Sequence, residues 1–152
     1  MEQSMGNQLD LLGDFSVPPP KPQPVAETGP VADVDGVPSS LLILDTETSG
    51  LDPEVDSCLE VGAILFDVAS RSVLAQQSFL LPVETNAAEA INRIPAAVTR
   101  LPQPWSEGMS WFQNLVAAAD VLVAHNAAFD RQWFGRGALP PVRRPWLCSM
   151  DD

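Results

Sequence analysis

The sequence predicts a single α/β domain in which β-strands come first and helices follow. Residues 41–47, 58–68 and 73–83 are rich in apolar, β-branched and aromatic side chains and are separated by polar turns. Residues 106–119 carry apolar side chains at helical spacing, and a shorter apolar run follows at 121–124. We therefore expect a mixed sheet whose first three strands are antiparallel, with helices flanking it.

Length and charge limit the classes of protein. The 152 residues suffice for one domain with a real core. The net charge of −12 is unusual for a nucleic-acid-binding protein, yet bound divalent metals can neutralise both a site and a phosphate. No apolar run approaches the roughly 20 residues that a membrane span needs, and the first residues do not form a secretory signal. We expect a cytoplasmic protein without membrane contact.

The two cysteines are also consistent with a cytoplasmic protein. Cys58 and Cys148 are far apart and have no CxxC spacing, so reduced thiols are expected. A disulfide between them is the alternative.

Residues 1–38 are expected to be a disordered, proline-rich acidic tail that precedes the folded domain at 39–152. Residues 1–40 hold seven of the 15 prolines, and the run PPPKPQP at 18–24 can form neither a helix nor a central strand. The short apolar patch around Leu9 and Phe15 is a candidate segment for binding a protein partner. The alternative is a weakly structured terminus.

The first strand ends at an acidic edge. The apolar run 41–44 predicts a buried strand, which continues into Asp45-Thr46-Glu47 before Gly50 marks a turn. Because strand side chains alternate between faces, Asp45 and Glu47 point to the same side. Two such carboxylates repel each other unless a cation or a proton lies between them, and Mg²⁺ or Mn²⁺ prefers oxygen ligands. The alternative is a solvated strand end without chemistry.

The next elements follow from turns and spacing. The polar turn between the second and third strands favours an antiparallel hairpin. Residues 84–104 are mixed, with one short helix expected at 95–100 because Pro95 suits a first turn. In the helix at 106–119, Trp111, Leu115 and Ala118 are expected to share the apolar face.

The stretch VLVAHNAAFDRQWF carries the second acidic feature. A short strand at 121–124 is followed by Asn126 as an N-cap and a helix that runs through Phe134. Asp130 lies in its first turns, where a carboxylate also stabilises the helix dipole. Residues 146–148 predict one more short strand.

The segments ILDTETSG, CLEVGAILFD and VAHNAAFD resemble, in order and spacing, the first two exonuclease motifs of the DEDD superfamily of 3'-5' exonucleases. This superfamily includes the proofreading subunit of bacterial DNA polymerase III and ribonuclease T, and the resemblance covers residues 41–149. It implies a ribonuclease H-like fold and a role in DNA replication and repair. It also implies a hydrolase that removes nucleotides from the 3' end of single-stranded DNA or RNA with two divalent ions, Mg²⁺ or Mn²⁺.

The resemblance also implies roles for particular residues. Asp45, Glu47 and Asp130 correspond to the catalytic metal ligands of the first two motifs. Thr48 and Leu51 correspond to positions that line the terminal nucleotide.

For two further residues, a functional and a structural interpretation both remain open. Glu60 corresponds to a position that is acidic in many relatives, where it can make a supporting hydrogen bond or be an ordinary solvated residue. Phe129 can lie near a terminal base or pack against the sheet, and the spacing places it on one helical face with Trp133.

The chain departs from the family at the third motif, which supplies a histidine or tyrosine as general base and an aspartate four or five residues later. The sequence has no tyrosine, and its one histidine, His125, belongs to the second motif. Asp151 and Asp152 follow the last strand too soon. We therefore expect a member truncated at its C-terminus. The alternatives are a non-catalytic nucleic-acid-binding module and a protein that docks a partner through its tail.

Overall fold

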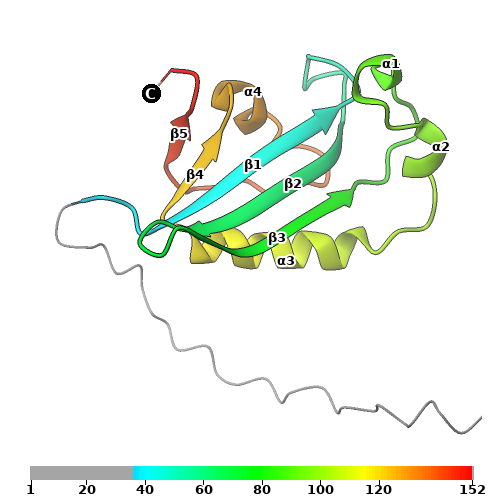
Figure 1. The fold of residues 1–152 in the computed structure, drawn as a ribbon. Coiled ribbons are helices and arrows are strands. Elements are labelled where there is room, and N and C mark those ends of the chain that lie inside the picture. The colour runs from blue at the N-terminus through cyan, green and yellow to red at the C-terminus, as the bar shows by residue number, and fades with distance from the viewer. Residues whose placement is uncertain (1–35, 152) are drawn as a thin grey trace, which may run out of the picture.

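The computed structural model describes residues 36–151, so most of the predicted tail at 1–38, including Leu9 and Phe15, lies outside the described residues. A five-stranded mixed sheet has the strand order β3-β2-β1-β4-β5 (Figure 1). Its strands are β1 (Ser40–Thr48), β2 (Cys58–Asp67), β3 (Ser72–Leu80), β4 (Val121–Ala124) and β5 (Trp146–Cys148). The helices are α1 (Glu89–Asn92), α2 (Ala96–Thr99), α3 (Trp105–Ala118) and α4 (Ala127–Arg131). The predicted α/β fold is confirmed.

The strand directions also match the prediction. β1, β2 and β3 form antiparallel pairs, whereas β4 is parallel to β1 and β5 is parallel to β4. A parallel pair needs a crossover connection. The chain between β3 and β4, which contains α1 to α3, supplies that connection for β1 and β4.

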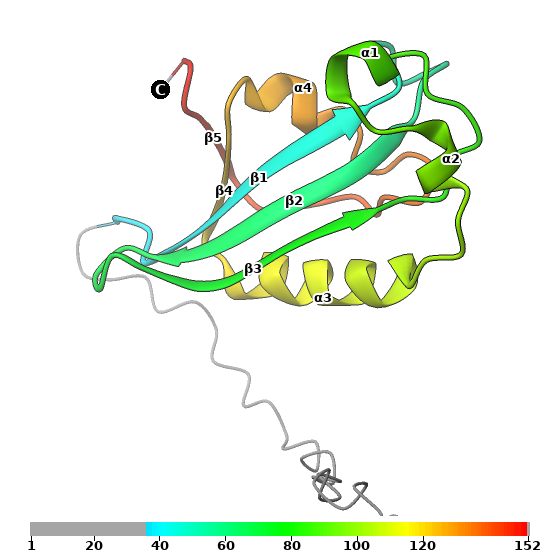
Figure 2. The ribbon, with the colours of Figure 1, turned by 45° about the vertical axis from the view of Figure 1, so that its right-hand side comes forward.

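Helix α3 covers one face of the sheet, and the main core lies between them (Figures 1 and 2). Leu42 and Leu122 from the sheet and Phe112 from α3 are fully buried there. The expected apolar face of this helix was wrong at Trp111, which is 47% exposed, and at Ala118, which is also exposed.

The buried side of α3 instead carries Met109, Phe112 and Leu115. Close packing with β3 fixes this rotation, because a Cβ added at Gly108 would lie only 2.7 Å from Phe79 Cγ. The rings of Phe79 and Phe112 have centroids 6.4 Å apart. Helix rotation is thus set by the close contact at Gly108.

The opposite face of β1 is open, which corrects the expectation of a fully buried strand. Leu42 and Leu44 face the core, whereas Ile43 is 40% exposed and shares the open face with Asp45. Alternation puts these residues on opposite sides of the strand, and α3 covers only one of them. The start of the acidic edge is therefore accessible.

Several element boundaries differ from those expected. Helix α1 had not been predicted, and β3 ends at Leu80 rather than at residue 83. Helix α4 ends at Arg131, after which Trp133 and Phe134 amides donate to carbonyls three residues earlier. Asn126 holds the N-cap position of α4, but with a left-handed φ of 60° and without a capping hydrogen bond from its side chain.

Two predictions about the rest of the chain concern membranes and disulfides. Within residues 36–151, no helix is long and apolar enough to cross a membrane. Cys58 and Cys148 are not joined by a disulfide in this structure, so the alternative pairing is excluded.

Candidate active site

The acidic pair lies on the open face of the sheet, near the C-terminal end of β1. In the antiparallel register, Asp45 is opposite Gly62 and Glu47 is opposite Glu60. Gly62 has no side chain, and a groove of about 500 Å³ runs beside Asp45 over this part of β1, β2 and β3. Asp45 is therefore open to a ligand, with space next to it.

Asp130 reaches the acidic pair from a different element. It is only 2% exposed, and its Oδ1 accepts hydrogen bonds from the backbone nitrogen of Thr46 at 3.0 Å and from Thr46 Oγ1 at 2.8 Å. Thr46 lies in β1 between Asp45 and Glu47. These two hydrogen bonds therefore fix α4 against β1 and place Asp130 where its charge and the charges of the acidic pair act on one another.

The carboxylates influence each other's protonation. Burial raises the pKa of Asp130 to about 6, and the negative charge of Asp45 adds to the rise, although the hydrogen bonds from Thr46 lower it. Burial also raises the pKa of Glu47, and the charges of Asp45, Glu60 and Asp130 raise it further. The three predicted residues and Glu60 thus form one electrostatic cluster of like charges.

No cation of the described chain balances this cluster. Within residues 36–151 the one ion pair joins Arg136 to Glu54, away from these carboxylates. Carboxylate oxygens are the ligands that Mg²⁺ and Mn²⁺ prefer. The donor set of Asp45, Glu47 and Asp130 therefore fits a hard divalent ion. The side chains are not preformed around one point, since the part of the chain that the structure describes contains no group of three or more His, Cys, Asp or Glu side chains arranged to hold a metal.

Of the two interpretations of Glu60, the structure favours the supporting hydrogen bond. Its carboxylate accepts a hydrogen bond from the hydroxyl of Ser78 on β3, the strand on the other side of β2. Glu60 is half-buried on the same face as Glu47. It is consequently held in place at the edge of the cluster.

The two residues that were expected to contact the substrate, Thr48 and Leu51, differ in the exposure of their side chains. Leu51 is 80% exposed in the loop after β1. Thr48 is buried, its hydroxyl donates to the carbonyl of Gly50 at 2.6 Å, and its own carbonyl accepts from Asn92 Nδ2 at 2.9 Å. Leu51 can thus touch a ligand directly, whereas the hydroxyl of Thr48 shapes the turn.

Phe129 packs against a neighbouring ring. Its ring meets that of Trp133 edge to face, with centroids 5.9 Å apart, and Trp133 is almost fully buried. The structure therefore favours the packing interpretation of Phe129, and the predicted pairing of these residues on one face is confirmed.

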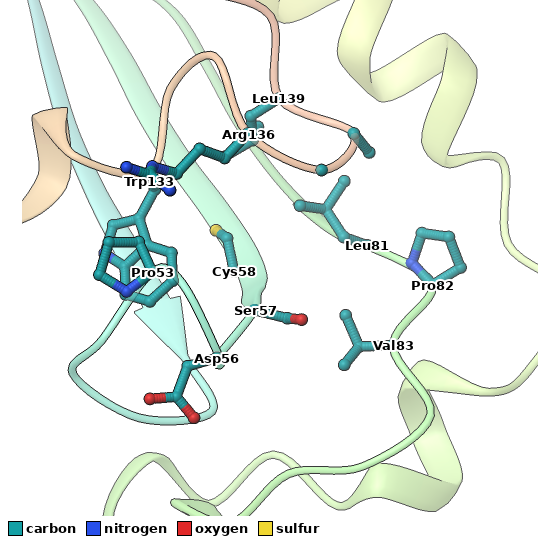
Figure 3. A pocket seen from close by; sticks show the side chains of 12 residues that line it. Pro53, Asp56, Ser57, Cys58, Leu81, Pro82, Val83, Trp133, Arg136 and Leu139 are labelled. Atoms are coloured by element: carbon teal, nitrogen blue, oxygen red, sulfur yellow. The ribbon is translucent and has the colours of Figure 1, made fainter.

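A small cavity of about 170 Å³ lies next to Trp133, between the β1–β2 loop, the chain after β3 and the chain after α4 (Figure 3). Its walls include Cys58, Leu81, Trp133 and Leu139 (Figure 3). Burial raises the pKa of the Cys58 thiol to about 12, so this sulfur stays protonated and unreactive at neutral pH. None of the predicted site residues lines this cavity.

Thr46 and Asn92 were missed in the sequence. Thr46 stands inside the first motif, so its position between two acids was visible, but its role as an anchor for Asp130 depends on a contact 84 residues away in the chain. Asn92 lies in a mixed segment without periodicity, and its bond to Thr48 spans 44 residues. Long-range contacts of this kind leave no local signal.

Comparison with known sequences gives a distant relationship. No protein-family model matches the chain. The DNA polymerase III PolC-type proteins of Thermotoga petrophila and Thermotoga maritima are each 25% identical over 122 residues, which is 74% of this chain. The chain spans only 8% of the length of these relatives.

Solved structures share the fold. A structure of Escherichia coli exonuclease I with a dT13 oligonucleotide matches 74% of this chain and 28% of its own, with a TM-score of 0.58 and 19% identity. The zinc-ion-bound form of the exonuclease I complex with single-stranded DNA matches 62% of this chain and 22% of its own, with a TM-score of 0.53 and 20% identity. The resemblance to DEDD-type exonucleases is thus confirmed at the level of the fold.

Proposed function

We propose that this chain contains the N-terminal part of a DEDD-type 3'-5' exonuclease domain, which hydrolyses phosphodiester bonds at the 3' end of single-stranded nucleic acid. Residues 39–152 form that part, and residues 1–38 form a separate tail. One observation carries the proposal: Asp130 of α4 is hydrogen-bonded to Thr46, the residue between Asp45 and Glu47. This contact between the two motifs, together with the influence of the three carboxylates on each other's pKa, supports a shared site.

We assign Asp45, Glu47 and Asp130 as the residues that hold two divalent ions, Mg²⁺ or Mn²⁺. When bound, such ions supply an activated water and stabilise the leaving 3' oxygen. Support for this role comes from the cluster of like charges, which lacks a cation from the described chain. Thr46 holds Asp130 in place through its hydroxyl.

The terminal nucleotide is assigned to the loop after β1. Leu51 offers exposed apolar surface there, against which a nucleotide can pack. The acidic character of the chain is consistent with this role, because bound metals and not lysine or arginine side chains would meet the scissile phosphate.

The test is release of nucleotides from single strands labelled at the 3' or the 5' end, with Mn²⁺ and with EDTA. Early release of the 3' label, abolished by EDTA and by Asp45→Asn or Asp130→Asn, is the expected result. Glu107→Gln, which removes an exposed carboxylate on α3, is the control and should leave the rate unchanged. Cleavage that persists in either site variant would refute the assignment of the site.

A second function is favoured by one observation, the absence of an assignable general base. The sequence has no tyrosine, and its one histidine, His125, belongs to the second motif. The Nδ1 atom of this histidine lies 3.2 Å from Ser149 Oγ. In this alternative the chain binds 3' ends in a metal-dependent way without cleaving them. Mn²⁺-dependent binding of a single strand, with no label released, would select this function.

The tail adds a separate proposal, that residues 1–38 bind a protein partner. It is supported by the apolar patch around Leu9 and Phe15 within a proline-rich acidic sequence. Deletion of these residues should abolish capture of that partner and leave behaviour towards nucleic acid unchanged.

A further inference from the structure

The end of β1 is held by a pair of asparagines from a distant segment. The β1–β2 ladder is irregular between Glu47 and Thr48, where the register shifts. At this shift the carbonyl of Thr48 accepts a hydrogen bond from Asn92 Nδ2 at 2.9 Å. A side chain 44 residues away thus takes part in closing the strand next to the acidic residue Glu47.

Asn92 is itself fixed by Asn86. The Asn86 amide donates to Asn92 Oδ1 at 2.9 Å and to the carbonyl of Ile94 at 2.7 Å, while Asn86 Oδ1 accepts from the backbone nitrogen of Ala88 at 3.0 Å. Asn92 Oδ1 also accepts from the backbone nitrogen of Ile94 at 3.1 Å. We call Asn86 and Asn92 the asparagine clasp. Its amides are satisfied on both sides, which makes it a rigid connection.

The clasp joins α1 to the end of β1, from which the β1–β2 loop continues. Figures 1 and 2 both place α1 beside the C-terminal end of β1. The β1–β2 loop is closed at its neck, because Ser49 and Ser57 exchange two hydrogen bonds of 2.9 Å. The loop carries Leu51, which is 80% exposed, and α1 carries Ile91, which is 84% exposed. Both are large apolar side chains that gain nothing in stability from this exposure.

We propose that the asparagine clasp is a positioning device for the 3'-terminal nucleotide, with Asn92 as its key residue. The inference rests on the proposed function. By fixing α1 to the carbonyl of Thr48, the clasp sets the distance between α1 and the β1–β2 loop, which begins directly after Thr48. Asn92 touches neither metal ligands nor substrate in this role, and it acts through the backbone of Thr48.

Asn92→Asp is the most informative substitution. It keeps the shape of the side chain but replaces the amide donor by a carboxylate oxygen, which cannot donate to the Thr48 carbonyl. Asn114→Asp on the exposed side of α3 makes the same charge change away from the site and is the matched control. Asn86→Ala is the second variant, because it removes the support of Asn92 without placing a charge next to Thr48.

The measured quantity is the preference of the protein for a strand with a 3' end over a strand without one. Fluorescence anisotropy would compare a short linear single strand, protected by a phosphorothioate at its 3' end, with a circular strand of the same sequence, both in Mn²⁺. We expect wild type to prefer the linear strand. Asn92→Asp should reduce that preference roughly tenfold, and Asn86→Ala should reduce it less. Mn²⁺ affinity should stay close to wild type in both variants, and both should remain folded at the assay temperature.

The outcomes separate this inference from the proposed function. A wild type without preference for the linear strand would contradict the proposed function itself. A wild type with the preference, together with an unchanged preference in Asn92→Asp, would overturn the clasp alone. Unfolding of both clasp variants, or an equal loss of Mn²⁺ affinity, would also overturn it, because the clasp would then support the fold in general.

Discussion

The Asp130 carboxylate and Thr46 are joined by two hydrogen bonds, one from the backbone amide and one from the hydroxyl of the threonine. Thr46 points to the buried side of β1, whereas its neighbours Asp45 and Glu47 lie on the open face. One residue therefore connects the position of helix α4 with that of the acidic pair. Four consequences of this arrangement and of the core can be measured.

Loss of the Thr46 hydroxyl should destabilise the fold. Thr46→Val keeps the volume of the side chain and removes the hydroxyl hydrogen bond to Asp130, while the hydrogen bond from the backbone nitrogen of residue 46 remains. We expect the free energy of unfolding to fall by about 1–2 kcal/mol, as for a buried hydrogen bond to a carboxylate. Urea denaturation would measure it, and Thr46→Ser, which retains the hydroxyl, should lose clearly less. Equal losses in the two variants would show that the hydrogen bond from the Thr46 hydroxyl does not stabilise the fold.

The metal-free protein should be more stable in mild acid than at neutral pH. Burial raises the pKa of Asp130 to about 6, so the folded state binds this proton more tightly than the unfolded state does. Stability from this group is present at low pH and is lost as the pH rises from about 4 through 6. Between pH 5 and pH 7.5 the expected loss is about 1 kcal/mol. Glu47 shifts in the same direction.

Asp130→Asn is the variant that tests this origin of the pH dependence. It removes the ionisable group and retains an oxygen that can accept from Thr46. Most of the slope between pH 5 and pH 7.5 should disappear in chemical denaturation. If the variant keeps the slope of wild type, the pH dependence has another source.

Gly108→Ala should destabilise α3, although this replacement usually stabilises a helix interior. The added Cβ would lie 2.7 Å from Phe79 Cγ, so ring and helix must move apart. A loss of about 1–3 kcal/mol is typical of such overpacking. Ser110→Ala at an exposed position of α3 is the control. A melting temperature for Gly108→Ala at or above wild type would mean that the Phe79 contact does not set the rotation of α3.

The sequence was most informative where local pattern and burial agree. The strand at 121–124 was predicted with its observed ends, because a compact apolar run lies between polar residues. Asp45, Glu47 and Asp130 were selected by motif spacing, and the hydrogen bonds of Thr46 now bring α4 to the acidic pair.

Other features depend on contacts that a local pattern does not contain. The burial of Met109 and Phe112 in place of Trp111 follows from the contact between Gly108 and Phe79, which are far apart in sequence. The four-residue helix α1 is too short to show periodicity. Its connection to β1 through Asn92 is equally invisible before the chain is folded.

The central claim is that Asp45, Glu47 and Asp130 together bind a divalent ion, and the most direct measurement is a Mn²⁺ titration followed by electron paramagnetic resonance. Wild type should bind Mn²⁺, and Asp45→Asn and Asp130→Asn should each weaken binding roughly tenfold or more, as expected for loss of a carboxylate ligand. The control Glu107→Gln, at an exposed position of α3, should bind as wild type does. Equal Mn²⁺ binding in all four proteins, or no binding by wild type, would contradict the assignment.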